Sequence, residues 1–234
     1  MEKQHHFTGQ DPLKQLLFKN IQAILQENPF VQSILPAFEQ IMEFAQVIIE
    51  QLEESGQSPL VSCQCGCSYC CHSQVKIIPI EALLIYTYVK RTFNDIEISD
   101  LKKRILFFSN LTRGKTFEQR FSMKQALPCI FLKSEQCCIY QARPSICRSW
   151  NSLAQSACIT AYNSKNSQAE IESSPARDYV YGSARELFEM ITRQQALQAQ
   201  TLHMHQAIDD CFNNPDPLTQ WSRGIDIFHI RPRM

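Results

Sequence analysis

Between residues 11 and 55 the apolar side chains recur every three or four positions, which is the spacing of one helix face. Asp11-Pro12 and Asn28-Pro29 each join a capping residue to a proline, the usual opening of a helix. Ser55-Gly56 is a typical end, because glycine readily adopts the backbone conformation that closes a helix. The pattern therefore predicts a helical hairpin, in which Pro36 kinks or splits the second helix.

The rest of the chain is also patterned mainly as helix. Residues 57–75 read as a polar, cysteine-rich loop, and residues 75–78 fit a short strand. Later helices are expected over residues 79–91, from Ser99 or Asp100 onward, and over one long stretch from about 176 to 212. A small hairpin is expected within residues 128–140, and residues 213–217 break the last helix before an irregular tail or short strand over 221–234.

The composition describes a folded, electrically balanced chain. Of its 234 residues 44% are hydrophobic and 20% are charged, so a sizeable core can form. Lys plus Arg and Asp plus Glu each total 23, and a net charge of zero argues against a strong binder of nucleic acid or anionic membranes. With only 6 glycines, a glycine-rich phosphate-binding fold is not expected.

The compartment expected from the sequence is the cytoplasm. Residues 1–6 lack the basic and then apolar layout of a secretory signal, and no apolar run reaches the roughly 18–20 residues that span a bilayer. Cytosolic thiols are kept reduced. The 11 cysteines are therefore expected to be metal ligands or catalytic thiols rather than disulfide partners.

Ten of the 11 cysteines fall into two blocks. In the first block, Cys67-x2-Cys70 has the spacing of a chelating pair, whose sulfurs can both reach one ion at about 2.3 Å. Cys63 extends the pair, and the adjacent Cys70 and Cys71 suit two neighbouring metals, or one ligand and one spare thiol. Cys211 stands apart and is expected to be a small buried residue. The first block is Cys63, Cys65, Cys67, Cys70 and Cys71, and the second is Cys129, Cys137, Cys138, Cys147 and Cys158.

Two other cofactor motifs come close to this spacing. Cys63-x3-Cys67-x2-Cys70 matches the iron–sulfur signature of radical S-adenosylmethionine enzymes, but the pattern lacks the alternating strands and helices of their barrel. Covalent haem attachment needs C-x-x-C-H, and here Cys71 follows Cys70. His72 is an alternative metal ligand.

Four motifs occur together along the middle of the chain: Cys63-x3-Cys67-x2-Cys70-Cys71, Pro79-Ile80-Glu81-Ala82, Pro128-Cys129-Ile130-Phe131-Leu132 and Cys137-x-Ile139-Tyr140-x2-Arg143-Pro144-x2-Cys147-Arg148. They resemble the CxxCxxCC cysteine-cluster family, also called YkgJ-like, whose domain is described as chelating zinc or iron. The resemblance covers about residues 60–160, and the fourth motif is its most specific part. Ile130 departs from the pattern, because the family usually has proline after this cysteine.

The resemblance implies zinc or iron as the metal, with an iron–sulfur cluster as one form of the iron. Some relatives resemble iron–sulfur-dependent protein methylases that act on lysine. Cys65 and Cys138 occupy variable positions of the family, so either could replace a neighbouring ligand. The eight ligands that the resemblance implies are Cys63, Cys67, Cys70, Cys71, Cys129, Cys137, Cys147 and, less securely aligned, Cys158.

The expected fold class is mostly α, a helical domain with a cysteine-rich metal-binding loop region and a small β-hairpin. Residues 1–57 are expected to be a helical hairpin that packs on the core, and residues 58–160 the cysteine-cluster metal-binding domain. Residues 161–234 are expected to form a long helix and tail that complete the same globule.

Cations beside an anionic thiolate cluster lower the cost of burying it. Arg143 and Arg148 flank Cys147, so we expect at least one of them to donate to a sulfur or to a carbonyl of the cluster loop. Either could instead bind an anionic substrate. Tyr140 and Trp150 are expected to pack over the cluster and exclude water.

Three functions fit these residues. A module that chelates zinc or iron needs only the cysteines, and predicts closed coordination with no pocket beside the metal. An iron–sulfur-dependent enzyme, such as a protein lysine methylase or a related redox catalyst, predicts an open cleft lined by Glu81, Tyr140, Arg143 or Arg148. A thiol redox sensor would use the two vicinal cysteine pairs. The first is favoured; neither nucleic acid nor a membrane is expected as a partner, and a protein partner or substrate stays open.

Overall fold

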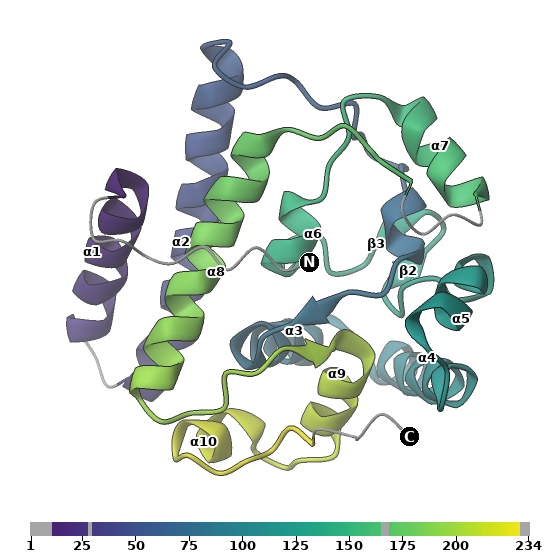
Figure 1. The fold of residues 1–234 in the computed structure, drawn as a ribbon. Coiled ribbons are helices and arrows are strands. Elements are labelled where there is room, and N and C mark those ends of the chain that lie inside the picture. The colour runs from purple at the N-terminus through teal and green to yellow at the C-terminus, as the bar shows by residue number, and fades with distance from the viewer. Residues whose placement is uncertain (1–10, 28–29, 165–168, 230–234) are drawn as a thin grey trace.

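The computed structural model describes residues 11–27, 30–164 and 169–229, which form a mostly α-helical fold (Figure 1). In these residues the strands make two short antiparallel pairs, so the predicted fold class is confirmed. Asn28-Pro29, the expected opening of the second helix, lies outside the described residues. The elements are α1 (Pro12–Glu27), α2 (Phe30–Glu54), η1 (Tyr69–His72), β1 (Lys76–Ile77), α3 (Pro79–Thr92), α4 (Asp95–Thr112), α5 (Phe117–Ser122), η2 (Lys124–Ala126), β2 (Leu132–Lys133), β3 (Gln136–Cys137), α6 (Ser145–Ser149), α7 (Gln155–Asn163), α8 (Pro175–Gln194), β4 (Leu202–His203), α9 (Met204–Phe212) and α10 (Pro217–Ser222).

The first two helices form the predicted hairpin. The Asp11 carboxylate accepts hydrogen bonds from the N–H groups of Leu13 and Lys14 at 3.1 and 3.2 Å, so it caps α1. α2 runs unbroken through Pro36, so the helix is not split there. It stops just before Gly56, which has a φ of +72° and closes the helix as predicted.

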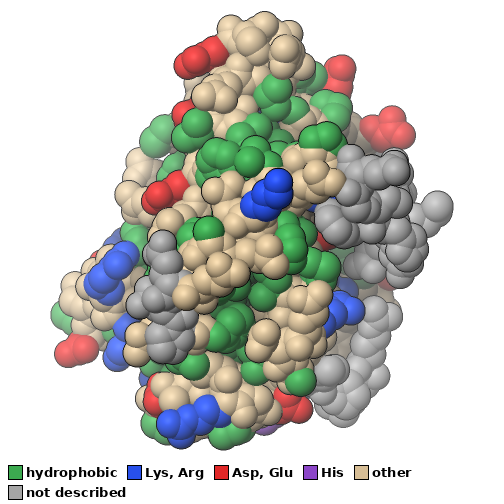
Figure 2. Space-filling view, turned by 90° about the vertical axis from the view of Figure 1, so that its left-hand side faces the viewer, with side chains coloured by type: hydrophobic (Ala, Val, Ile, Leu, Met, Phe, Trp, Pro, Cys, Tyr) green, Lys and Arg blue, Asp and Glu red, His purple; other side chains and the backbone are tan. Residues whose placement is uncertain are grey.

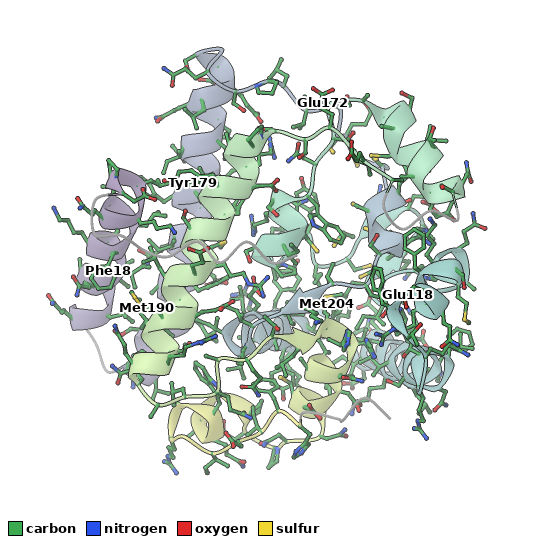
Figure 3. The ribbon with its side chains drawn as sticks, in the orientation of Figure 1. Phe18, Glu118, Glu172, Tyr179, Met190 and Met204 are labelled. Carbon is green, nitrogen blue, oxygen red and sulfur yellow. The ribbon has the colours of Figure 1, made fainter. Side chains whose placement is uncertain are left out.

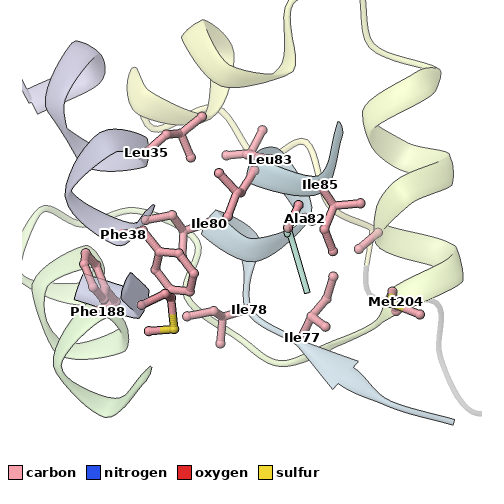
Figure 4. Packing of buried hydrophobic residues seen from close by; sticks show 14 of the residues in the cluster. Leu35, Phe38, Ile77, Ile78, Ile80, Ala82, Leu83, Ile85, Phe188 and Met204 are labelled. Atoms are coloured by element: carbon pink, nitrogen blue, oxygen red, sulfur yellow. The ribbon is translucent and has the colours of Figure 1, made fainter. Parts of the chain in front are cut away.

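α3 lies within the core. Its residues from Pro79 to Ile85 are all buried, which suits a helix that is apolar on nearly every side. α2 and α9 both pack against α3, and α8 packs against α1, α2 and α6. Figure 4 shows Phe38 of α2 near Ile80 of α3, and its ring lies 4.8 Å from the ring of Phe188 of α8.

The start of α4 differs from the prediction. The helix begins at Asp95 rather than at Ser99 or Asp100. Asn94 and Glu97 form a capping box, in which each side chain accepts the backbone N–H of the other residue at 3.0 Å. The cap satisfies N–H groups that the first helical turn leaves without partners, and so sets the boundary.

The single long helix predicted from about 176 to 212 is wrong. α8 ends at Gln194, and Ala196 has a φ of +54° that turns the chain away from the helix. The chain then forms β4, which pairs with β1 in the register Lys76↔His203 and Ile77↔Leu202. The strand pairing joins segments far apart in sequence, which a helical pattern of apolar residues does not reveal.

The hairpin predicted within residues 128–140 is confirmed in a shorter form. β2 pairs with β3 in the register Leu132↔Cys137 and Lys133↔Gln136. Ser134 and Glu135 make the turn, with φ values of +50° and +59°. Two residues with positive φ suit a tight hairpin because their twist matches that of the strands.

One buried carboxylate joins the start of α3 to the start of α6. Glu81 has no exposed surface. Its Oε2 accepts the N–H of Ile78 at 2.9 Å, and its Oε1 accepts the N–H and the hydroxyl of Ser145 at 2.7 and 2.5 Å. Backbone N–H groups at helix starts stabilise such a buried negative charge. The contact fixes the chain after the first cysteine block against the helix that carries Cys147.

The surface agrees with the balanced composition. On the face that Figure 2 shows, acidic and basic side chains are interspersed rather than gathered in a patch of one sign. None of the helices in the described part of the chain combines the length and the apolarity needed to cross a bilayer.

Glu81→Gln is expected to lower the free energy of unfolding by about 2–3 kcal/mol, because the new amide group leaves a buried N–H without its acceptor. Urea unfolding of the variant measures the loss. Glu43→Gln, on the exposed face of α2, is the matched control and should change stability by less than about 0.5 kcal/mol. Equal unfolding midpoints for the two variants would show that Glu81 does not hold α3 and α6 together.

Candidate metal centre

The first cysteine block lies in a loop that is bonded to the segment before α7. The Ser62 N–H donates to the Ser152 carbonyl at 2.8 Å, and the Ser62 hydroxyl donates to the Leu153 carbonyl. The Leu153 N–H donates in turn to the carbonyl of Glu172, ahead of α8, at 2.9 Å (Figure 3). These bonds hold the first cysteines beside α7, the helix that carries Cys158.

Main-chain contacts also join the first block to the second. The Cys129 N–H donates to the Cys71 carbonyl at 2.6 Å. Cys137 lies on β3, which is paired with β2 just after Cys129. Cys147 lies on α6, whose start is held by Glu81. The backbone alone therefore brings cysteines of both blocks into one region.

Four thiols, those of Cys63, Cys67, Cys70 and Cys158, line one cavity of about 440 Å³. Burial raises the pKa of Cys63 and of Cys67. The negative charges of Cys70 and Cys158 raise both pKa values further, which indicates close spacing. Figure 3 shows sulfur atoms in this region, between α6 and α7. We call these four residues the cavity set.

A second set consists of Cys71, Cys129, Cys137 and Cys147, and its last three members pack against the hydrophobic core. Burial raises the pKa of Cys129 to about 12 and the pKa of Cys147 well above its ordinary value. The charge of Cys137 raises both values further. The pKa of Cys71 is raised by its hydrogen bond with Cys70 and by burial, and the charges of Cys129 and Cys137 add to the rise. We call these four residues the core set.

Cys70 links the two sets. A hydrogen bond with the Cys71 thiol lowers the pKa of Cys70 to about 7. Its charge also raises the pKa of Cys129, Cys137 and Cys147, which belong to the core set. The eight cysteines implied by the family resemblance thus form one electrostatically coupled network, although the ligand set itself stays a prediction.

The remaining candidates lie at the margin of this network or outside it. All 11 cysteines are free thiols. Cys65 is exposed, and Cys138 raises the pKa of its neighbour Cys137 by its charge. Cys211 is fully buried in α9, as predicted. His72 hydrogen-bonds through Nδ1 to the Lys124 carbonyl at 3.2 Å.

Arg143 and Arg148 donate to main-chain carbonyls of the loop that precedes α6. The Arg148 Nε donates to the Arg143 carbonyl at 3.0 Å, and its guanidinium also donates to the Gln141 carbonyl at 2.5 Å. The Arg143 Nε donates to the Tyr140 carbonyl at 3.2 Å. The positive charge of Arg143 lowers the pKa of Cys70 and of Cys137. This side chain therefore offsets thiolate charge electrostatically, while its hydrogen bond goes to a main-chain carbonyl.

Two further arginines, which the sequence motifs did not indicate, lie near the cysteines. Arg104 of α4 donates to the carbonyls of Ile130 and Leu132 at 3.0 and 3.2 Å, and its charge lowers the pKa of Cys129. Arg177 of α8 lowers the pKa of Cys63 and pairs with Glu53 of α2 at 2.8 Å. Both come from helices outside the motifs, so only the tertiary fold places them here.

The two aromatic residues expected to cover the cluster have different positions. Tyr140 is 61% exposed and stacks with Arg143, whose guanidinium carbon lies 3.7 Å from the ring centre. Tyr140 therefore lies largely at the surface, and its expected role in excluding water stays a prediction. Trp150 lies on the wall of the cavity, beside the cavity set.

Among the described residues, the cavity wall has four aromatic side chains and two charged groups that already have partners. Tyr69 and Tyr162 meet edge to face at 5.5 Å. Lys124 donates from Nζ to two main-chain carbonyls at 2.7 Å and lies 3.8 Å over the ring of Phe121. Burial raises the pKa of Asp178, against hydrogen bonds that lower it. The described wall thus combines aromatic and aliphatic side chains with four thiols.

This cavity differs from both expectations for the site. A closed chelating module predicts no pocket beside the cysteines, and the cavity lies directly against four of them. The residues expected to line an enzyme cleft, Glu81, Tyr140, Arg143 and Arg148, do not line it. Glu81 is instead a buried structural carboxylate.

The donors fit zinc or iron by their chemistry. Thiolates are preferred ligands of zinc and of iron–sulfur clusters, and nearby arginines supply positive charge. Within the described ranges, no three Cys, His, Asp or Glu side chains already stand in the compact arrangement of a metal site.

Comparison with known proteins gives a match over the region that contains both cysteine blocks. The family model CxxCxxCC, described as "Putative zinc- or iron-chelating domain", matches residues 62–168. No curated protein and no solved structure matches the chain.

Arg148→Lys is expected to destabilise the metal-free protein by about 1–3 kcal/mol, because an ammonium cannot reproduce the two guanidinium hydrogen bonds to the loop before α6. Urea unfolding with a chelator present measures this separately from metal affinity. Arg223→Lys, at an exposed position after α10, is the control and should leave the midpoint unchanged. A midpoint for Arg148→Lys that equals the control would show that the loop does not depend on Arg148.

Proposed function

We propose, from the premise that residues 62–168 belong to the CxxCxxCC family, that this chain binds zinc or iron through cysteines of both blocks. The observation that carries the proposal is the coupled thiol network, which the backbone assembles from segments far apart in the sequence. The proposed ligands are Cys63, Cys67, Cys70, Cys71, Cys129, Cys137, Cys147 and Cys158.

The raised pKa values of most of these thiols suit a metal as the partner. A buried thiolate is costly without a compensating cation, so the thiols of Cys129 and Cys147 hold their protons in the metal-free protein. A metal ion displaces those protons and supplies the missing positive charge. Binding would draw the sulfurs to about 2.3 Å from zinc and tighten the loops that carry them.

Metal analysis distinguishes zinc from iron. Protein purified without oxygen should contain zinc and be colourless, or contain iron and acid-labile sulfide and absorb broadly in the visible range. Folded protein without metal would overturn the proposal and leave a thiol redox sensor, for which the contact between Cys70 and Cys71 would be the natural redox pair.

A second candidate is an iron–sulfur-dependent enzyme, either a protein lysine methylase or a related redox catalyst. The cavity of about 440 Å³ beside the cavity set favours it, because catalysis needs room for a substrate next to the centre. Iron with sulfide in the first measurement would make this candidate the leading one.

Cys67→Ala and Cys147→Ala are each expected to lose metal and lower the melting temperature together, because metal binding and folding are linked. The metal-to-protein ratio and a thermal melt give the two readouts. Cys65→Ala and Cys138→Ala are matched controls, since these cysteines lie outside the proposed ligand set and should keep the wild-type metal content. Unchanged metal content in Cys67→Ala and Cys147→Ala would remove both residues from the set.

A further inference from the structure

We propose that the hydrogen bond from the Ser68 hydroxyl to the Glu135 carboxylate is a latch that positions the first cysteine block for metal binding and slows release of the metal. The inference rests on the proposed function, and it treats the cysteines of both blocks as one network. Ser68 follows Cys67 of the first block, and Glu135 lies two positions before Cys137 of the second. Neither is a proposed ligand, and both act as positioning residues through the cysteines beside them.

The loop of the first block is attached at few points, and Ser68 is one of them. Residues 61–70 are exposed or half-buried except for Ser68, which is 6% exposed. Main-chain hydrogen bonds to other segments fix the loop at Ser62 and again at Cys71. Ser68 lies between these points and adds an attachment through its side chain. A buried hydroxyl is costly without a partner, so the loop keeps this position only while the carboxylate accepts the bond.

The hairpin that carries Glu135 is held firmly in place. β2 and β3 pair on either side of the turn. Arg104 of α4 donates to the carbonyls of Ile130 and Leu132 at 3.0 and 3.2 Å. Ile130 and Phe131, just before β2, are buried in the hydrophobic core. The latch therefore attaches the first block to a fixed point of the second block.

The backbone of the turn supports a role for the Glu135 side chain. Ser134 and Glu135 have φ values of +50° and +59°, a region in which tight hairpin turns prefer asparagine and glycine. A glutamate at this position makes the turn less favourable than a glycine would, and the hairpin itself gains nothing from it. The carboxylate instead contacts another segment, because it reaches Ser68. A strained residue with a distant partner is typical of a functional position.

A restrained first block lowers the cost of binding a metal. In the part of the chain that the structure describes, no three candidate ligands stand close enough together to hold an ion, so the thiols must draw together on binding. Groups that are already restrained lose less conformational entropy when they become ordered. Residues that hold the ligands of a metal typically change its affinity by 10–100-fold when they are replaced. The latch is placed to act in this way on Cys67 and on Cys137.

The test measures zinc affinity and zinc release in reducing, oxygen-free buffer, with the chelator 4-(2-pyridylazo)resorcinol as the competitor. Ser68→Ala and Glu135→Gly should each weaken zinc binding and speed zinc release by about 10-fold, with an unchanged number of zinc ions per chain. The double variant should be no worse than either single variant, because all three lack the same bond. Additive losses in the double variant, or wild-type release in both single variants, would overturn the inference.

Matched variants separate the latch from a purely structural role of the turn. Glu135→Gln keeps an acceptor oxygen and should release zinc at close to the wild-type rate. Ser134→Gly relaxes the backbone of the same turn, and Gln64→Ala shortens an exposed side chain of the same loop, so both should leave the rate unchanged. If only the backbone of the turn mattered, Glu135→Gly would behave like Ser134→Gly, and that result would reject the latch.

Failure of the latch and failure of the proposed function give different results. Ser68→Ala should still fold, because Glu135 is exposed and water can solvate its carboxylate. A wild-type chain that binds zinc, with equal release rates in all variants, rejects the latch and preserves the proposed function. A wild-type chain that retains neither zinc nor iron rejects the proposed function, and the latch falls with it.

Discussion

The Glu81 carboxylate is the contact on which the arrangement of the cysteines depends. It is fully buried, and it accepts hydrogen bonds from the start of α3 and from the start of α6. α3 follows the first cysteine block, and α6 carries Cys147 of the second. A charge buried in this way is tolerated only while its donors stay in place. The contact therefore sets the distance between the blocks, and the bond from Cys129 to the Cys71 carbonyl sets their orientation.

Local sequence signals were sufficient for α1 to α4 and for the hairpin, because caps, prolines and apolar spacing act within a few residues. The short helices α5, α6, α7 and α10 were not predicted. Local signals failed where distant segments decide the structure. The stretch around Ala196 has no glycine or proline, and the break between α8 and α9 accompanies the pairing of β4 with β1. At α4 the signal was present, since Asn94 and Glu97 are a capping pair, but the prediction placed the cap later.

In the candidate metal centre, too, some features follow from the local sequence and others from tertiary contacts. Cysteine spacing indicates which thiols belong together within a block, and the fold couples the eight family positions electrostatically. The cavity and the arginines on α4 and α8 depend on tertiary contacts, so no motif could indicate them. Arg104 and Arg177 bring positive charge to opposite sets, the first to Cys129 and the second to Cys63. The protein thus neutralises its two groups of thiols from different helices.

The two tryptophans differ in their exposure to solvent, and this difference affects the intrinsic fluorescence of the protein. Trp150 lies on the cavity wall and is 36% exposed, whereas Trp221 has no exposed surface and donates from its indole to the Gln198 carbonyl at 3.1 Å. Indole fluorescence shifts to longer wavelength as water gains access to the ring. Emission at the red edge therefore reports on the cavity, and emission at the blue edge reports on the packing around α10. The chain carries separate optical reporters of its site and of its fold without any added label.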